Sequence, residues 1–532
     1  MAKQPPARRV PRYTKVMKRT PLYEQHVRDA AAVINLKGFA RAMQYRGHAV
    51  EHRATREQVT LCDVSHMGEL EFKGPDALAL VQKLITNDAA RLAVNQALYS
   101  TMCDERGILL DDLVCYRLAA DRFVWVVNVT KTDDDYQWVL KHARGMDVQV
   151  TNISSDTALL ALQGPQSRET LQRIAQADLS SLKYYWLTQT AVHTRHAEVP
   201  CIISRTGYTG ELGYEIMVAR DLAPWVWDEL LMAGQALGIM PAGVAARESL
   251  RTEAGYLLNG NDMDPQTNPI EAGLAWVVKP AKDFIGRDAL ARIQAQGVAR
   301  KLVGLEVEGN HTIRNGYPIY RGGKEVGKVT SGPLSPQLTG RNLGLGYVAS
   351  EHAEIGTELE VAIRGRKSRA HVVATPFSAR RVKHEPAVTT YSPYALHYSQ
   401  SHVWACSEET AGNVVAIGLS DFGQRSLGDI LSLDLPKVGA RVVKGSAAGW
   451  IDSYRRPLDI VSPVTGEVVE IDEALMQKPA RINAYPYARS GMLKVRLDAR
   501  RDYEEMMRFK EYAELVHRLQ RYDEWSSDRR MT

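Results

Sequence analysis

Two adjacent carboxylates interrupt an apolar segment that follows a glycine, in Gly107-Ile-Leu-Leu-Asp-Asp-Leu-Val-Cys-Tyr. Neighbouring residues of a β-strand point to opposite faces, so Asp111 and Asp112 are expected to play different parts. A carboxyl group enclosed in such a segment has a raised pKa and can exchange protons near neutral pH. The alternative is the end of a hairpin with two solvated acids. The segment therefore makes this pair a candidate acid–base site.

A glycine-rich segment, Thr206-Gly-Tyr-Thr-Gly-Glu-Leu-Gly-Tyr-Glu-Ile, adds an aromatic ring at Tyr208 and a carboxylate at Glu215. It follows neither the dinucleotide pattern nor the P-loop pattern, which disfavours binding of nucleotide phosphates. Its glycines let the backbone approach a ligand closely. A carboxylate accepts two parallel hydrogen bonds, and a pterin or guanine edge presents two such donors. A surface loop with an exposed glutamate is the alternative.

Other candidates are weaker. His66 has no partner pattern, and a lone histidine is more often structural. Arg247 and Arg251 are spaced i,i+4 on a predicted helix, where they form surface ion pairs with Glu248 and Glu253 or reach an anionic ligand. The five cysteines are scattered and no C-x-x-C occurs, so we expect no metal site and no disulfide framework, and a reducing compartment fits best.

Strands and helices must position these residues. The alternation of apolar and polar residues predicts a strand over 69–73, a helix over 76–85, a strand over 123–129 and a helix from Asp133. The same alternation of strands and helices continues to about residue 275, which indicates α+β or α/β structure with antiparallel hairpins.

After about residue 285 the predicted helices give way to short strands. Short β-rich runs over 286–385 predict a small barrel, and 395–495 form another β-rich unit. Residues 501–522 predict a charged helix with a docking face, formed by Met506, Phe509, Ala513 and Val516.

Composition bounds the class of protein. The chain has 532 residues, of which 45% are hydrophobic and 24% charged, as in a soluble globular protein of three to four domains. No run approaches 18 apolar residues, so no membrane span is expected. The net charge of +5 comes from seven lysines and arginines within residues 1–20, which contain no acid. Because the rest of the chain is near neutral, no nucleic-acid surface is expected. The tail is predicted to be a disordered cytosolic arm, with an organellar transit peptide as the alternative.

Seven segments, in order, resemble the glycine cleavage system T-protein, a tetrahydrofolate-dependent aminomethyltransferase. They are Thr20-Pro-Leu-Tyr-Glu-Gln-His, Asp63-Val-Ser-His-Met, Leu110-Asp-Asp-Leu-Val, Val126-Val-Asn, the Thr206 segment, Asp283-Phe-Ile-Gly-Arg-Asp-Ala-Leu and Thr330-Ser-Gly…Ser-Pro. The resemblance covers about residues 20–380. It implies a three-lobed ring around a folate cavity, with Asp111 as the catalytic aspartate. It also implies that Tyr208, Glu215 and Arg247 bind folate, and that Asn128 lies on a strand beside the cavity.

Residues 395–495 resemble the glycine cleavage H-protein, the carrier of the lipoyl arm. The matching segments are Ser401-His-Val-Trp, Gly418-Leu-Ser-Asp-Phe-Gly-Gln, Leu435-Pro-Lys-Val-Gly and Asp459-Ile-Val-Ser-Pro-Val-Thr-Gly-Glu-Val. Where that family has its lipoylated lysine, this chain has Arg455. An arginine stays protonated and cannot form the lipoyl amide. We therefore expect a carrier-like domain without its own arm.

The resemblance implies an α+β fold, with two α+β lobes and a small β-barrel followed by a carrier-like domain and a C-terminal helix. The predicted organisation is a basic tail (1–19), folate-binding lobes (20–285), a barrel lobe (286–385), a linker (386–394), the H-protein-like domain (395–495) and the C-terminal helix (496–532).

Three functions remain open. The chain is expected to be a tetrahydrofolate-dependent aminomethyltransferase served by a separate lipoylated H-protein. Alternatively it is a demethylase (methyltransferase) that takes the methyl group of a small O-, N- or S-methylated compound. A folate-binding scaffold without turnover is least favoured. A cytoplasmic location is expected, with the H-like domain packed on the transferase lobes and 501–522 as a clamp.

Overall fold

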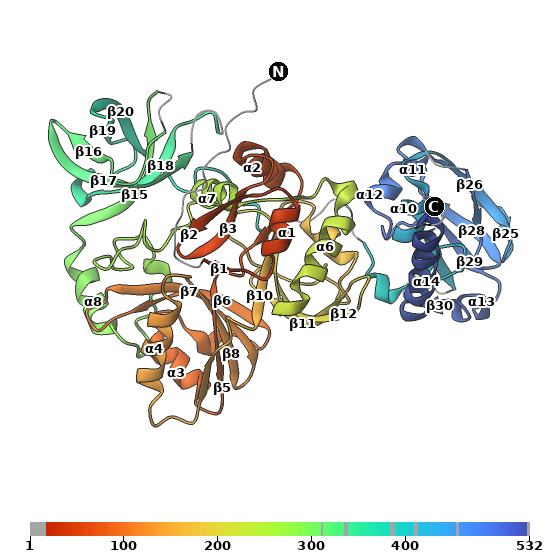
Figure 1. Cartoon of the computed structure of the whole chain (residues 1–532), viewed down its shortest axis with the longest axis horizontal. Coiled ribbons are helices and arrows are strands. Elements are labelled where there is room, and N and C mark those ends of the chain that lie inside the picture. The colour runs from red at the N-terminus through yellow and green to blue at the C-terminus, as the bar shows by residue number, and fades with distance from the viewer. Residues whose placement is uncertain are drawn as a thin grey trace, which may run out of the picture.

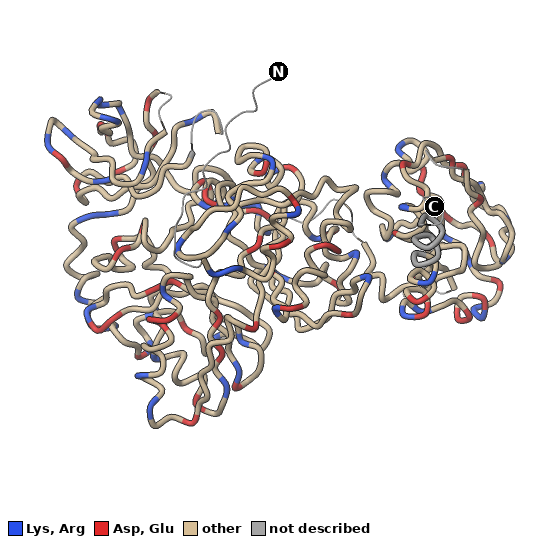
Figure 2. Tube along the Cα trace, viewed as in Figure 1, with Lys and Arg blue, Asp and Glu red and all other residues tan. Residues whose placement is uncertain are grey.

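The computed structural model describes residues 17–309, 312–334, 339–383, 388, 390–408, 413–453 and 457–528. These residues form two bodies of unequal size (Figure 1). The larger body holds two α+β lobes and a β-barrel, and the smaller one holds the C-terminal β-rich unit. Figure 2 shows basic and acidic residues interspersed along the described trace.

The first lobe is a five-stranded antiparallel sheet covered by two helices. Its strand order is β6 (Gln96–Cys103), β7 (Leu109–Ala119), β8 (Arg122–Val127), β5 (Gly68–Lys73) and β9 (Gln149–Asn152). The helices are α3 (Ala77–Leu84) and α4 (Thr132–Ala143). Their apolar faces join Leu70, Phe72 and Trp125 in one core. These elements confirm the strands and helices that the sequence pattern predicts here.

The second lobe is a six-stranded sheet built around a completely buried central strand. Its order is β11 (Leu187–His193), β12 (Glu198–Ser204), β13 (Gly213–Ala219), β10 (Thr157–Gln163), β4 (Thr60–Asp63) and β14 (Met240–Pro241). Helices α5 (Ser167–Gln172) and α6 (Ala223–Ala233) cover it. Every residue of β10 is buried, because the sheet is covered on both faces.

A three-stranded sheet and three helices join the lobes. The sheet has the order β1 (Lys18–Arg19), β3 (Phe39–Gln44) and β2 (Ala32–Leu36). The helices are α1 (Tyr23–Arg28), α2 (His48–Glu57) and α7 (Val244–Glu253). Helix α7 contacts α2, β3 and the barrel, so it lies where the parts of the larger body meet.

The third lobe confirms the predicted small barrel. Helix α8 (Arg287–Gln296) leads into six strands that close in the order β15 (Arg300–Val307), β18 (Leu343–Ala349), β17 (Lys324–Leu334), β16 (Pro318–Arg321), β19 (Glu358–Ile363) and β20 (Arg366–Val373). Leu305, Ile319 and Val361 fill its interior.

The smaller body contains two sheets. Seven strands have the order β25 (Arg441–Val442), β28 (Gly466–Ile471), β29 (Leu493–Leu497), β23 (Val414–Leu419), β22 (Val403–Ser407), β21 (His397–Tyr398) and β30 (Met507–Arg508). The smaller sheet consists of β24 (Ile430–Asp434), β26 (Ala447–Ser453) and β27 (Leu458–Val461). The helices are α10 (Asp421–Leu427), α11 (Glu473–Gln477), α12 (Arg481–Ala484), α13 (Arg501–Glu504) and α14 (Phe509–Asp528).

The predicted continuous helix over 501–522 is divided in the structure. Helix α13 ends at Glu504, and Met507–Arg508 form β30, which pairs with the edge strand β21 before α14 begins. Pairing satisfies backbone groups of β21 that would otherwise be open, and this outweighs the local helical pattern. Helix α14 then packs on β21 within the same body.

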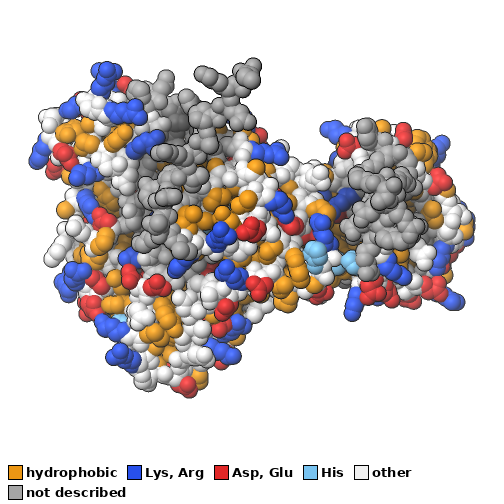
Figure 3. Space-filling view, viewed as in Figure 1, with side chains coloured by type: hydrophobic (Ala, Val, Ile, Leu, Met, Phe, Trp, Pro, Cys, Tyr) orange, Lys and Arg blue, Asp and Glu red, His pale blue; other side chains and the backbone are white. Residues whose placement is uncertain are grey.

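The smaller body packs on the outer side of the second lobe, where the molecule narrows (Figure 3). Arg173 is almost completely buried there and donates to Ala233 O (2.8 Å), Asn483 O (3.3 Å) and Ala484 O. The ring of Phe509 meets His193 of β11 at 5.0 Å between centroids. The interface therefore joins elements of both bodies through polar and aromatic contacts.

Candidate functional site

A β-bulge places the two aspartates of β7 at the end of the first lobe. Met102 pairs with Asp111 and Cys103 with Leu109, which leaves Leu110 as an extra residue. The Asp111 carboxylate accepts hydrogen bonds from Asn128 N (3.0 Å), Asn128 Nδ2 (2.8 Å) and Asn259 Nδ2 (2.7 Å). Its side chain has no exposed surface, and burial raises its pKa, while hydrogen bonds from Asp135 and then Asn128 partly offset the shift. Asp111 is thus enclosed by amides rather than open to a ligand.

Asp112 has different surroundings. Its carboxylate accepts from Asn128 Nδ2 (2.8 Å) and from the hydroxyl of Tyr99 (2.9 Å), and it stays partly exposed. Burial and the charge of Asp111 raise its pKa to about 7. The two aspartates therefore differ in their surroundings, as strand alternation predicts, although the Asn128 amide beyond the end of β8 contacts both.

A third acid, Asp135 of α4, stands behind this pair. It is buried, and burial together with the charge of Asp111 raises its pKa to about 10. Asp135 therefore holds its proton at neutral pH. Sequence reasoning missed Asp135, because an acidic residue in the first turn of a helix is explained by the helix dipole alone. It also missed Tyr99 and Asn259, which carry no motif.

The glycine-rich segment forms the second part of the site. The ring of Tyr208 stacks on Tyr256 with 5.6 Å between centroids and 14° between planes. The guanidinium carbon of Arg247 lies 4.7 Å from the centroid of the Tyr208 ring, and the Tyr208 hydroxyl donates to Leu257 O. The structure thus brings Tyr208 and Arg247 into direct contact, as a flat aromatic and cationic surface.

Glu215 lies on β13 beside this surface. Thr206 Oγ1 donates to its Oε2 at 2.5 Å, and the Tyr116 hydroxyl donates to the same oxygen at 3.4 Å. Within the described part of the chain, Oε1 has no hydrogen-bond donor. Burial raises the pKa of this carboxyl group. A partly buried carboxylate with one free oxygen is suited to accept hydrogen bonds from a ligand.

One strand connects the two parts. Asp112 and Tyr116 are four residues apart on β7 and therefore lie on the same face of the sheet. Tyr116 contacts Glu215, and the charge of Asp112 is among the influences that raise the pKa of Tyr208. The aspartates, Glu215 and Tyr208 thus border one region between the lobes.

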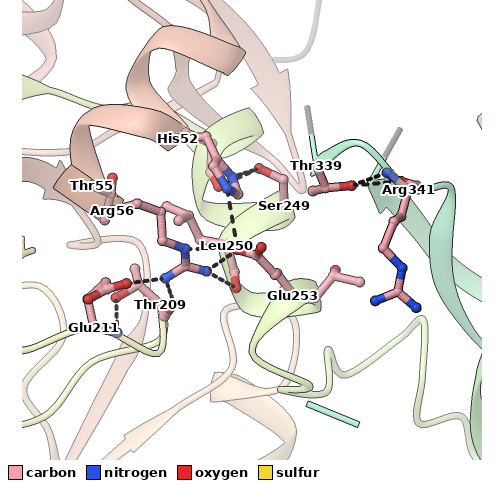
Figure 4. Close-up of polar contacts among 12 residues, drawn as sticks. His52, Thr55, Arg56, Thr209, Glu211, Ser249, Leu250, Glu253, Thr339 and Arg341 are labelled. Atoms are coloured by element: carbon pink, nitrogen blue, oxygen red, sulfur yellow. Dashed lines mark hydrogen bonds and ion pairs between the residues drawn. The ribbon is translucent and has the colours of Figure 1, made fainter. Parts of the chain in front are cut away.

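A polar network holds the glycine-rich segment in place (Figure 4). Arg56 of α2 donates to Glu253 Oε2 of α7 (2.5 and 2.8 Å) and, through Nη1, to Thr209 O (2.7 Å) and Glu211 Oε1 (3.0 Å). His52 Nδ1 and Ser249 Oγ are 2.8 Å apart on the same two helices. Glu253 thus pairs with Arg56 of α2. The sequence suggests a surface ion pair between Glu253 and Arg247 or Arg251 instead.

The turn within this segment also requires a glycine. Gly210 has a φ of +79°, and a Cβ atom there would lie 2.7 Å from the Cβ of Ala254 on the helix side. Any larger residue would move the segment away from α7.

Arg251 and His66 also lie inside the molecule. Arg251 is fully buried and donates to Asp262 Oδ2 (2.6 Å), to Ser331 Oγ of the barrel (2.7 Å) and to Glu248. It is therefore a structural residue that joins α7 to β17. His66 is buried, and its Nδ1 has no hydrogen-bond partner in the described residues.

Arg455 falls outside the described residues, so the predicted loss of the lipoyl site remains a statement about sequence. Among the described residues, no group of three potential metal ligands occurs, and no helix is long and apolar enough to cross a membrane.

Comparisons with known proteins agree with this arrangement. Residues 22–282 match the GCVT N-terminal domain, 300–378 the glycine cleavage T-protein C-terminal barrel domain, and 396–519 the glycine cleavage H-protein. The aminomethyltransferase of Desulfitobacterium hafniense is 44% identical over 369 residues, which cover 69% of this chain and 99% of that protein. The aminomethyltransferase of Symbiobacterium thermophilum is 46% identical over 367 residues, covering 68% and 97%.

A solved structure gives the same result. The glycine cleavage system aminomethyltransferase T of Bartonella henselae is 34% identical, has a TM-score of 0.64, and matches 69% of this chain and 99% of its own. The fold and these relatives together define a tetrahydrofolate-dependent transferase. The chain belongs to the glycine cleavage T-protein, or aminomethyltransferase, family and carries an H-protein domain in the same polypeptide. The predicted family, fold class and use of tetrahydrofolate are confirmed.

Proposed function

We propose that this chain transfers a one-carbon unit to N5 of tetrahydrofolate, bound between the β7 aspartates and the glycine-rich segment. The observation that carries the proposal is Glu215 Oε1, which has no hydrogen-bond donor among the described residues and lies next to the Tyr208–Arg247 surface. A pterin edge offers the paired donors that such a carboxylate accepts. When bound, the folate supplies the nitrogen that receives the one-carbon unit.

Within this function, Asp112 is our candidate for the proton-exchanging group. Its pKa is raised to about 7, it remains partly exposed, and it lies on the same face of β7 as Tyr116. A group that titrates near the working pH is best suited to general acid–base catalysis. The carboxylate of Asp111, predicted above as the catalytic residue, supports a positioning role better, because its side chain has no exposed surface whereas Asp112 is partly exposed.

Two donors remain candidates. A separate lipoylated H-protein is one, as expected for an aminomethyltransferase. The second is a small O-, N- or S-methylated compound, which would make the chain a demethylase. The observation in favour of the second is Arg455, which stands at the lipoyl position of the domain that this chain carries. Arg173 and its partners hold the H-like domain on the second lobe. This is a structural role for the domain, and a structural role requires no lipoyl arm.

The test is a tetrahydrofolate assay with both donor classes and identification of the folate product by mass. Methylenetetrahydrofolate formed only from aminomethyl-lipoyl H-protein supports the first donor, and methyltetrahydrofolate formed from a methylated compound supports the second. Absence of any folate product, with folate binding intact, would leave the scaffold hypothesis. Intact-mass measurement of protein produced beside a lipoyl ligase should show no lipoyl adduct.

The five free cysteines, all buried, support the proposal of a cytoplasmic location.

A further inference from the structure

A cavity lies next to the proposed folate site and is lined by two guanidinium groups. It is lined by Arg41 of β3, Arg247 of α7 and His66 of the turn after β4, together with Cys62 and Asp63. Arg247 borders both regions, because its guanidinium group also lies over the Tyr208 ring. An occupant of this cavity would therefore be a direct neighbour of the proposed pterin site.

Arg41 is the unusual member of this cavity. Only 7% of its surface is exposed, yet its guanidinium group has no hydrogen bond or ion pair to any described residue. Burial and the nearby charge of Arg247 lower its pKa to about 9. A buried cation without a partner is costly, and proteins usually place a carboxylate or another anion against it.

The nearby acidic side chains bind other residues and not the Arg41 guanidinium group. Asp63 is bound by His26 Nε2 at 2.8 Å and by Ser65 N at 2.9 Å, and Glu248 pairs with Arg251. Cys62 donates to Ala242 O, and burial raises its pKa to about 12, so it is not an anion. The Nδ1 atom of His66 adds a further buried polar atom without a partner among the described residues.

We propose that this cavity binds a carboxylate, and that this carboxylate is the anionic end of a small methylated one-carbon donor. The inference rests on the proposed function and specifies its substrate class. A guanidinium fork matches a carboxylate with two parallel hydrogen bonds. The tail carboxylates of folate are a less suitable occupant, because the p-aminobenzoyl group separates them from the pterin, whereas Arg247 places this cavity at the pterin end.

Calorimetry on the full-length chain tests this assignment without turnover. The probes are methoxyacetate, (methylthio)acetate and N-methylglycine, each compared with its uncharged primary amide, in a buffer free of carboxylates and phosphate. At least one acid should bind, and its amide should bind at least about tenfold more weakly. Arg41→Met should weaken the acid by a similar factor, with Arg41→Lys intermediate because it keeps the charge and loses the fork. The exposed Arg53 on α2 supplies the matched control, Arg53→Met, which should bind as the unmodified chain does.

Tetrahydrofolate binding, measured separately, distinguishes failure of this inference from failure of the proposed function. Arg41→Met should change folate affinity by less than about twofold, and it should raise the melting temperature, since it removes an unpartnered buried charge.

Equal binding of acid and amide, or unchanged binding by Arg41→Met, would overturn the carboxylate site. Loss of folate binding with unchanged acid binding would assign Arg41 to the folate tail instead. Inorganic phosphate that binds as tightly as any acid, through Arg41, would overturn the donor class. If the unmodified chain binds no folate, the proposed function itself fails, whatever the acids do.

Discussion

At the scale of single residues, Glu215 allows the most direct test of folate recognition, because its Oε1 has no donor among the residues that the structure describes. Glu215→Ala removes the acceptor and leaves paired pterin donors unsatisfied, so tetrahydrofolate binding should weaken by about 1–3 kcal/mol. Calorimetry with the purified chain measures this. The exposed Glu198 of β12 gives the control Glu198→Ala, which should bind folate normally. Unchanged affinity of Glu215→Ala would place the pterin elsewhere.

The two β7 aspartates should separate in a kinetic experiment. Asp112→Asn preserves shape and removes proton exchange, so kcat should fall about 10²–10⁴-fold. Because the ionised carboxylate accepts the proton and its pKa is raised to about 7, kcat/KM of the unmodified chain should decrease as the pH falls below 7.

Asp111→Asn removes a negative charge that contributes to the raised pKa of Asp112. The acid limb of the pH profile of kcat/KM should therefore shift to lower pH in the Asp111→Asn variant. Its kcat should fall less than that of Asp112→Asn. A silent Asp112→Asn beside a strongly impaired Asp111→Asn would restore Asp111 as the proton-exchanging residue.

At the scale of elements, helix α7 depends on one buried ion pair. Arg251 and Asp262 are both completely buried, and Arg251 also binds Ser331 of β17. Arg251→Leu leaves Asp262 charged and unpaired, and should lower the free energy of unfolding of the larger body by about 3–5 kcal/mol. Urea denaturation followed by tryptophan fluorescence measures the loss. Adding Asp262→Leu should recover part of it, since no isolated charge then remains; a double variant less stable than the single one would contradict this explanation.

At the scale of the whole molecule, Arg173 holds the H-like body on the second lobe. Its side chain is only 2% exposed and contacts both bodies, including Asp421 at 3.6 Å. Arg173→Met should make the two bodies melt separately in calorimetry, because the carbonyl groups of Asn483 and Ala484 lose their donor. The exposed Arg144 provides the control, Arg144→Met. A single unchanged transition for Arg173→Met would show that the remaining contacts between the bodies suffice.

The interface also bears on how a donor reaches the site. The residues of the second lobe that contact the smaller body include Gln166, Arg173, Asp178 and His193. None of the contacts found between described residues of the two bodies involves the β7 aspartates or Glu215. Among the described residues, the H-like body therefore contacts the second lobe away from the β7 aspartates and Glu215.

Local patterns in the sequence determined much of this protein. Strands such as β5 and β8 and helices such as α3 and α4 follow from periodicity, which depends only on neighbours in the chain. Ordered motifs likewise identified the family and singled out Asp111, Asn128, Tyr208, Glu215 and Arg247. The absence of the lipoyl lysine at Arg455 is also a property of sequence alone.

Only the tertiary structure decided what surrounds each of these residues. Asn259 binds Asp111 across 148 residues of sequence, and this contact, with the bulge at Leu110, encloses Asp111 and leaves Asp112 the more accessible acid. Arg41, in a short strand without any motif, is a buried cation with no partner among the described residues because β3, β4 and α7 meet around one cavity. A pKa, a free acceptor oxygen and an unpaired charge arise from burial and from distant neighbours. Local sequence specifies none of these three properties, because burial and distant neighbours are fixed only when the chain folds.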